Sequence, residues 1–323
     1  MPKVSVIIPV YKVEKYIERC ARSLFEQSLE EMEFIFVDDC SPDNSISIIK
    51  TVAEDYPKRK SQIKFLYHKV NRGLTTARNT GLSVATGDYI ACCDSDDWTD
   101  TFMYEKLYNC AIDQKAEVVF CNFSFAFDDS YELYESTAVY YDKDKTICSY
   151  IQTCWTVLWN MIAKRDLYET NHLRSPENIS YCEDFWLSIR LFFYASKIAK
   201  VNEALYFYNQ MNANSIVHGL NRKMELDERW AYLDTISFFK ENGKYDEYKK
   251  VLCWRVLKST QDAAVYYDRY KEFLELYPES HKFIWSCPYD INLKSRIIMS
   301  LLAFYPLRFI GVFLVWFRKL LQR

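Results

Sequence analysis

Short apolar runs alternate with amphipathic segments along the first 125 residues. Four of the runs are typical of buried parallel strands: residues 4–10, 34–37, 63–67 and 89–93. Between them, apolar side chains recur every three or four positions, which predicts helices with one buried face. The first such face is formed by Val13, Ile17, Cys20 and Leu24, and a later helix is predicted over 74–85. This alternation predicts an α/β fold, a parallel sheet with helices on both faces.

The rest of the chain is less regular. Residues 126–150 are polar and rich in tyrosine, which favours an irregular connection or a β-hairpin. A helix is predicted over 182–196, and residues 221–285 are predicted to be helical.

The C-terminal segment combines apolar and basic residues. Residues 297–317 form a 21-residue apolar stretch interrupted by Ser300, Pro306, Arg308 and Gly311. Its length matches a transmembrane span, but a central Arg and Pro argue against one. Residues 294–323 carry six basic and no acidic side chains. We expect a basic amphipathic tail that lies in a membrane surface, with a true span or packing on the core as alternatives.

Composition narrows the class of protein. The 323 residues carry a net charge of −3, which excludes a generally basic nucleic-acid binder. Eleven cysteines without paired spacing predict reduced thiols of a cytoplasmic protein, and no signal peptide is recognisable. Glycine is scarce, yet three of the six glycines fall at Gly73, Gly81 and Gly87. A turn and close helix–sheet packing are therefore predicted there.

Acidic residues gather where two predicted strands end. Asp38 and Asp39 follow one strand, and residues 94–97 (Asp-Ser-Asp-Asp) follow another. Because ligands of parallel sheets bind at the carboxyl ends of the strands, both clusters should share one crevice. Three carboxylates within four residues are typical of a divalent-cation site, here for Mn²⁺ or Mg²⁺. The alternative is a solvated acidic turn that caps the next helix.

Three further side chains are candidates for binding a nucleotide. Arg78 is predicted to donate to a phosphate, or else to form a surface ion pair. Tyr11 presents an aromatic face to a base, unless it is simply packed. Asp39 is placed to accept from a base N–H or a ribose hydroxyl.

Five motifs occur in an order and spacing that resemble a known family: Val4–Tyr11 (VSVIIPVY), Phe36–Asp39 (FVDD), Ala77–Gly81 (ARNTG), Gly87–Ile90 (GDYI) and Asp94–Trp98 (DSDDW). Together they resemble family 2 glycosyltransferases, and the resemblance covers about residues 3–210. Cys40 stands where relatives usually carry Gly. The resemblance implies a GT-A fold, Rossmann-like with a mostly parallel sheet, and a helical C-terminal extension. The parts expected are a GT-A domain at 1–215 (halves 1–100 and 101–215), a helical extension at 216–290 and the tail at 291–323.

The same resemblance implies inverting transfer from a nucleotide-diphosphate sugar, most often a UDP sugar. Tyr11 and Asp39 would hold the base, with the backbone around Pro9 alongside. Asp96 would bind the metal, Asp94 would lie near the ribose and the metal, and Ser95 would belong to the same nucleotide-sugar site.

Residues further along the chain would complete the reaction centre. Asp184 matches the family's general base and Glu183 would support it; the alternative is an acidic pair favoured by a helix N-terminus. Trp155 and Trp186 are candidates for stacking on an acceptor sugar, or for core packing. In residues 206–215 the usual basic residue is replaced by Gln210 and Asn212, which weakens the case for closure over the diphosphate. His218 could assist, although a lone His is more often structural.

These features predict a glycosyltransferase that serves polysaccharide biosynthesis on the inner face of the cell membrane. Its acceptor would be a lipid-linked sugar or a growing glycan. A non-catalytic nucleotide-binding subunit of a glycan assembly complex is the alternative. A dinucleotide-dependent oxidoreductase is excluded, because the first strand–helix turn, residues 9–14, contains no glycine.

Overall fold

The computed structural model describes residues 1–135, 142–153, 156–213, 219, 221–266 and 268–321. Contacts divide the chain into two compact units, Met1–Leu220 and Asn221–Arg323. The finer division predicted from the sequence, at 215/216 and 290/291, stays a prediction.

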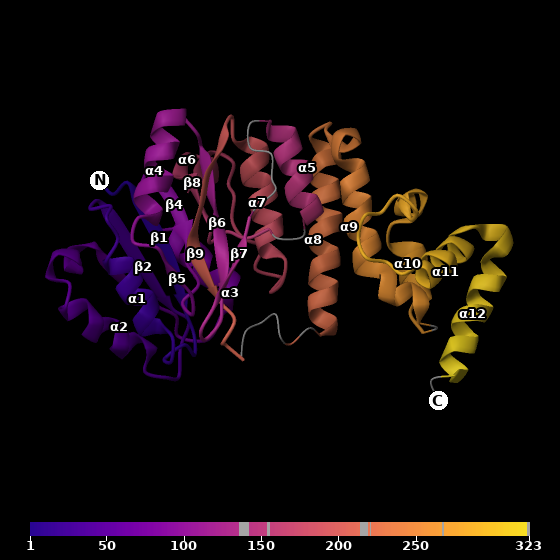
Figure 1. The fold of residues 1–323 in the computed structure, drawn as a ribbon, viewed down its shortest axis with the longest axis horizontal. Coiled ribbons are helices and arrows are strands. Elements are labelled where there is room, and N and C mark those ends of the chain that lie inside the picture. Colours follow the sequence, from indigo (N-terminus) through magenta and orange to yellow (C-terminus); the bar gives the residue numbers. More distant parts are fainter. Residues whose placement is uncertain (136–141, 154–155, 214–218, 220, 267, 322–323) are drawn as a thin grey trace. The chain divides into compact units, whose positions relative to one another are not determined.

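The first unit is built on a sheet to which nine described strands belong (Figure 1). Four predicted strands are confirmed and pair in parallel in the order β3-β2-β1-β4: Ile63–Tyr67, Met32–Asp38, Val4–Val10 and Tyr89–Cys92. The sheet then continues through β8 (Met161–Lys164), β6 (Val118–Ala126), β9 (Ile198–Asn209) and β5 (Trp98–Thr99). β8 runs antiparallel to both neighbours, whereas β6 and β9 are parallel. This second half is therefore mixed.

Helices cover both faces of the sheet because its strands alternate their side chains. Val4, Val6 and Ile8 of β1 pack in one core with residues of α1 (Ile17–Phe25), α2 (Ser45–Glu54) and α4 (Met103–Gln114). Ile7 points to the other face, where α3 (Leu74–Leu82) approaches so closely that a Cβ at Gly81 would lie 2.5 Å from Ile7 Cγ2. The predicted tight packing at Gly81 is confirmed.

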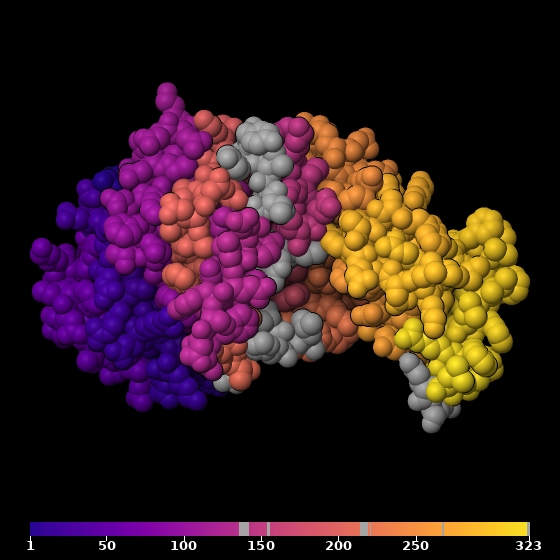
Figure 2. Space-filling view, viewed as in Figure 1, coloured from indigo at the N-terminus to yellow at the C-terminus, as the bar shows by residue number. Residues whose placement is uncertain are grey.

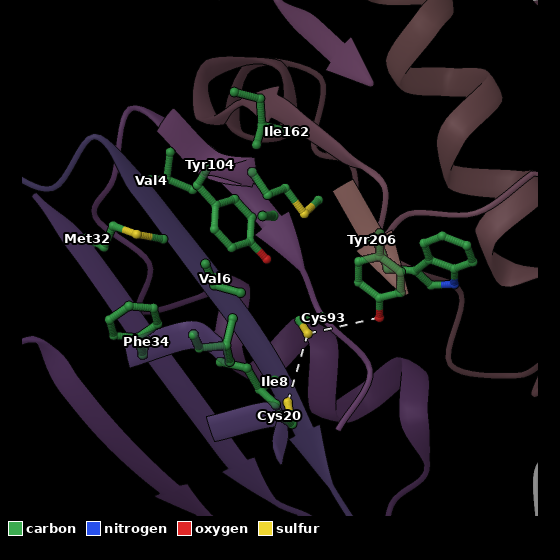
Figure 3. Close-up of a cluster of buried hydrophobic side chains, with 14 of the residues drawn as sticks. Val4, Val6, Ile8, Cys20, Met32, Phe34, Cys93, Tyr104, Ile162 and Tyr206 are labelled. Carbon is green, nitrogen blue, oxygen red and sulfur yellow. Dashed lines mark hydrogen bonds between the residues drawn. The ribbon is translucent and has the colours of Figure 1, made fainter. Parts of the chain in front are cut away.

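Cysteines take part in the first core as small apolar side chains. Figure 3 shows Cys93 between Cys20 and the hydroxyl of Tyr206, with each contact at 4.0 Å. Cys20, Cys93 and Cys121 are buried thiols that form no disulfide. Burial raises the pKa of Cys92 to about 12, so its thiol stays protonated.

Two segments of the first unit differ from the sequence-based expectation. The predicted hairpin exists as β7 (Tyr131–Tyr134) antiparallel to β6, but a helix that we did not predict, α5 (Lys143–Thr153), follows within the same stretch. The predicted helix at 182–196 is α7 (Glu183–Tyr194), preceded by the short α6 (Arg165–Thr170).

The second unit is helical, as predicted. It contains α8 (Arg222–Glu241) and α9 (Tyr245–Val265), which pack against each other, and the shorter α10 (Tyr270–Leu276). The C-terminal segment forms α11 (Leu293–Ala303) and α12 (Arg308–Leu321), joined by a single 3-10 turn at Tyr305–Leu307.

Candidate active site

All nine predicted site residues line one cavity of about 580 Å³ in the first unit. They come from the ends of β1, β2 and β4, from α3 and from the start of α7: Pro9, Tyr11, Asp39, Arg78, Asp94, Ser95, Asp96, Glu183 and Asp184. The parallel strands explain this convergence, since their carboxyl ends meet at one edge of the sheet. A cavity of this size suits a small-molecule ligand.

Asp97 has a structural place in the acidic cluster. It is buried, and its carboxylate accepts from the Tyr206 hydroxyl at 2.7 Å and from the backbone N–H of Asn209 at 2.8 Å. The same Tyr206 hydroxyl accepts from the backbone N–H of Asp94 at 3.1 Å. Burial, together with the charges of Asp96 and Asp94, raises the pKa of Asp97 well above its usual value. Asp97 therefore attaches the loop that follows β4 to strand β9. Asp94 and Asp96 of the same loop line the cavity.

Asp96 is held by the last residue of β9 and by the segment that follows it. Asn212 Nδ2 donates to Asp96 Oδ2 at 2.7 Å, and Asn209 Nδ2 donates to the Asp96 carbonyl at 2.9 Å. Burial and the nearby charge of Asp94 raise the pKa of Asp96, while the Asn212 hydrogen bond lowers it. Asn212 therefore contacts the carboxylate that we predicted as the metal ligand.

Arg78 forms the centre of the charged network. Its Nη1 donates to Asp184 Oδ1 at 2.6 Å and to Glu183 Oε1 at 3.0 Å, and its Nη2 donates to Asp94 Oδ1 at 2.9 Å. The residue is only 4% exposed, so the alternative of a surface ion pair is wrong. Burial opposes its charge, but the carboxylates of Asp184 and Asp94 keep the pKa of Arg78 well above its usual value. Both terminal nitrogens of the guanidinium already donate to carboxylates. The geometry therefore favours a role in which Arg78 positions these carboxylates over the predicted contact with a phosphate.

Asp184 stands at the start of α7. Its second oxygen, Oδ2, accepts from the Leu158 amide at 3.4 Å. Burial raises the pKa of Asp184 to about 7, against the lowering effect of Arg78, and the charges of Glu183 and Asp94 add to the rise. The side chain keeps 17% exposure, so it stays accessible from the cavity. A carboxylate whose pKa lies near neutral pH is suited to accepting a proton.

The Asp39 end of the cavity depends on a turn that requires glycine. Asp39 accepts from the backbone amides of Arg72 and Gly73, both at 2.8 Å, and contacts His68 Nδ1 at 2.6 Å. Gly73 has φ of +88° directly before α3, which confirms the predicted turn. Cys40 also has a positive φ, +58°, a conformation that glycine adopts more readily than other residues. We did not predict His68, although its place after β3 was a signal.

Aromatic residues form another part of the lining. Trp159 and Tyr208 both line the cavity, and Trp159 stacks on Tyr206 and Tyr208 with ring centroids 4.3 and 5.5 Å apart. We did not predict these two residues. Trp186 is not among the described lining residues, and the Arg190 guanidinium covers its ring at 3.7 Å. Trp155 and His218 lie outside the described residues.

Comparison with known proteins identifies the family. The family model for glycosyl transferase family 2 matches residues 5–186, a segment that contains every predicted site residue. The chain belongs to glycosyl transferase family 2. Two curated relatives from Bacillus subtilis (strain 168) agree. The putative glycosyltransferase EpsH is 32% identical over 258 residues, which cover 78% of this chain and 73% of EpsH. The uncharacterized glycosyltransferase EpsJ is 33% identical over 253 residues, which cover 75% of this chain and 71% of EpsJ.

Several solved structures have the same fold as this chain. Residues 1–349 of S. aureus TarS superpose with a TM-score of 0.67 at 18% identity, covering 99% of this chain and 92% of that one. The corresponding complex with UDP-GlcNAc gives 0.68 at 19% identity, covering 96% and 89%. A mannosyltransferase from Pyrobaculum calidifontis, solved with GDP-Man and Mn²⁺, gives 0.54 at 15% identity, covering 100% and 88%. At these identities the likeness concerns the fold, and it confirms the predicted GT-A architecture.

The family 2 site offers an incomplete set of metal ligands. Among the described residues, no three His, Cys, Asp or Glu side chains lie close enough together to hold an ion by themselves. Asp94 and Asp96 nevertheless present hard carboxylate oxygens to the cavity, which suit Mn²⁺ or Mg²⁺. Two carboxylates would fit such a cation if other groups supplied its remaining ligands.

Proposed function

We propose that this glycosyltransferase inverts the anomeric centre as it moves a sugar from a nucleotide-diphosphate sugar to a hydroxyl group. The observation that carries the proposal is the link through Arg78, which joins Asp94 of the predicted donor site to Asp184, the predicted base, in one cavity. A donor diphosphate and an acceptor hydroxyl would thereby meet at adjacent carboxylates.

The donor is expected to be a UDP sugar. Tyr11 is 40% exposed at the cavity and offers its ring to the base, while Asp39 and the backbone at Pro9 lie along the same wall. Asp94 and Asp96 would hold Mn²⁺ or Mg²⁺ against the diphosphate, and a bound cation would neutralise the charge that develops on the leaving group. The related structures named above bind UDP-GlcNAc or GDP-Man with Mn²⁺, which supports this class of donor.

The chemical step assigned to Asp184 is proton removal. Ionised Asp184 takes the proton of the acceptor hydroxyl, and the oxygen attacks the anomeric carbon from the face opposite the diphosphate. The bond between that carbon and the diphosphate oxygen breaks, and the electron pair leaves with the nucleoside diphosphate. Glu183 and Arg78 keep Asp184 oriented, and Trp159 and Tyr208 offer rings on which an acceptor sugar can stack.

We further propose a glycan or lipid-linked acceptor in polysaccharide biosynthesis at the cytoplasmic face of the cell membrane. The support is the apolar and basic surface of the C-terminal helices, which is described below.

Turnover of a donor panel tests the proposal. Purified protein is incubated with Mn²⁺ and UDP or GDP sugars, with and without mono- and disaccharide acceptors, and release of the nucleoside diphosphate is followed. We expect release from at least one UDP sugar, its loss in EDTA and its loss in Asp96→Ala. The anomeric configuration of the product, read by NMR, should be opposite to that of the donor. Tight UDP binding without turnover on any donor or acceptor would instead support the non-catalytic subunit.

A further inference from the structure

The second unit ends in a bent pair of apolar helices. Within the described part of the chain, no single helix has the length and apolar character needed to cross a bilayer. α11 and the segment Tyr305–Leu321 meet both criteria only together, and they are bent by 107° at Phe304. The turn carries Phe304 and Tyr305, which are 57% and 79% exposed.

One face of α12 is already used for packing. Gly311 and Val315 are buried on it. A Cβ at Gly311 would lie 2.9 Å from the backbone nitrogen of Leu302, so the two helices meet backbone to backbone. This contact fixes which side of α12 remains open.

The open side of α12 is apolar. Its exposed residues recur at helical spacing, which places them on one stripe: Phe309, Phe313, Trp316, Phe317, Leu320 and Leu321. Phe313 and Phe317 stack with ring centroids 6.2 Å apart, so the stripe is continuous. An amphipathic helix normally turns such a stripe toward the core, whereas here it faces outward. Figure 2 shows the side chains of this segment, in yellow, at the surface of the unit.

Basic residues accompany the apolar stripe. No Asp or Glu occurs between residues 291 and 323, and Lys294, Arg308, Arg318 and Lys319 are at least partly exposed. Lys319 pairs with Asp268 at 2.8 Å. Arg296 has a different role from the one we expected for the basic residues of the tail. Its guanidinium donates to backbone carbonyls, including those of Cys287 and Tyr289, so it fixes the turn before α11.

We propose that this helix-pair surface, formed by Phe304, Tyr305, the apolar stripe of α12, Lys294, Arg308 and Arg318, binds an anionic phospholipid surface. Aromatic and aliphatic side chains beside basic ones match the boundary between acyl chains and anionic headgroups. The bend lets α12 lie in that boundary plane without crossing it. A second copy of the chain is disfavoured as the occupant, because it would bring the same basic charge.

Vesicle flotation with the full chain tests this proposal. The vesicles contain phosphatidylglycerol with phosphatidylethanolamine, or phosphatidylcholine alone. The wild type should float with the anionic vesicles, and Phe313→Ser/Phe317→Ser should weaken binding by about tenfold or more, since the buried apolar area falls. Phe102→Ser/Leu226→Ser is the matched control, because these two apolar residues are also about half exposed but lie elsewhere. The control should bind like the wild type.

Charge and self-association are tested in parallel. Lys294→Gln/Arg318→Gln should lower binding to anionic vesicles and leave any binding to phosphatidylcholine unchanged. Thermal unfolding confirms that each variant is folded, and donor turnover on a soluble acceptor separates this surface from the proposed catalysis. Equal flotation of wild type and Phe313→Ser/Phe317→Ser would overturn the proposal. The proposal would also be overturned if no protein floats and light scattering shows a wild-type dimer that Phe313→Ser/Phe317→Ser dissociates.

Discussion

Arg78 Nη1 lies 2.6 Å from Asp184 Oδ1, and the same guanidinium reaches Asp94 at 2.9 Å through Nη2. Residues 94 and 184 are far apart in the sequence, and Arg78 holds their carboxylates in a fixed relation. It also compensates carboxylates that would otherwise repel one another in a partly buried site. Arg78 is therefore a positioning residue that links Asp94 of the proposed donor-binding site to Asp184, the proposed base.

Removing this cation should destabilise the fold in a pH-dependent way. We expect Arg78→Met to lower the unfolding free energy by about 3–5 kcal/mol at pH 8, because three carboxylates lose their partner. The loss should be smaller at pH 5, where Asp184, with a pKa of about 7, is protonated and carries no charge. Denaturant unfolding of Arg72→Met provides the control, since Arg72 is 49% exposed in its ion pair with Glu177. Equal losses in both variants, or a loss independent of pH, would contradict this role.

The rate should depend on ionisation of Asp184. A base must be deprotonated to act, so kcat/KM should rise about tenfold per pH unit below pH 7 and level off above it. Asp184→Asn should abolish this rise of kcat/KM with pH and lower kcat by about 10²–10⁴. The measurement is a pH profile of donor turnover at saturating Mn²⁺. A wild-type profile that stays flat from pH 5.5 to 8 would be incompatible with the assignment.

Asn212 should matter for cation affinity more than for folding. Asn212→Ala removes the donor that holds Asp96 Oδ2 at 2.7 Å, so the carboxylate is no longer oriented. We expect the Mn²⁺ concentration for half-maximal turnover to rise about tenfold, as for a lost charge-assisted hydrogen bond. Gln210→Ala is the neighbouring control, because Gln210 is not among the described lining residues. The same Mn²⁺ requirement in both variants would rule this role out.

Gly87 should tolerate no side chain. A Cβ there would lie 2.6 Å from the backbone nitrogen of Ser5 and 2.8 Å from its hydroxyl oxygen. Because a backbone atom cannot rotate away, Gly87→Ala should cost about 1–3 kcal/mol of unfolding free energy. Gly219→Ala should change it by less than about 0.5 kcal/mol, since no atom of the described residues beyond its chain neighbours lies within 4 Å of the added carbon. Thermal or denaturant unfolding of the two variants decides the point.

Much of the fold was predictable because central parallel strands bury both faces. β1 and β2 are buried almost throughout, so they read as unbroken apolar runs. α5 was missed because its buried residues, Ile147, Tyr150 and Ile151, are few and lie in a polar context. The antiparallel place of β8 depends on tertiary pairing with β4 and β6, which no local pattern specifies.

Site residues that directly follow a strand could be predicted from the sequence. Contacts between residues that are distant in the sequence could not. Asp39, Asp94 and Asp96 were found because each follows a recognisable strand. Two of the three carboxylate partners of Arg78 were not found, because Glu183 and Asp184 lie more than 100 residues away. Asn212 looked like the loss of a basic residue, and only the folded chain shows that it donates to Asp96.

The most direct test of the central claim separates donor binding from turnover in two variants. UDP binding with Mn²⁺, measured by titration calorimetry, is compared with steady-state turnover for the wild type, Asp96→Ala and Asp184→Asn. We expect Asp96→Ala to lose Mn²⁺-dependent UDP binding, and Asp184→Asn to bind UDP within about threefold of the wild type while kcat falls by about 10²–10⁴. Unchanged kcat in Asp184→Asn would contradict the account, because the proposed base would then be dispensable.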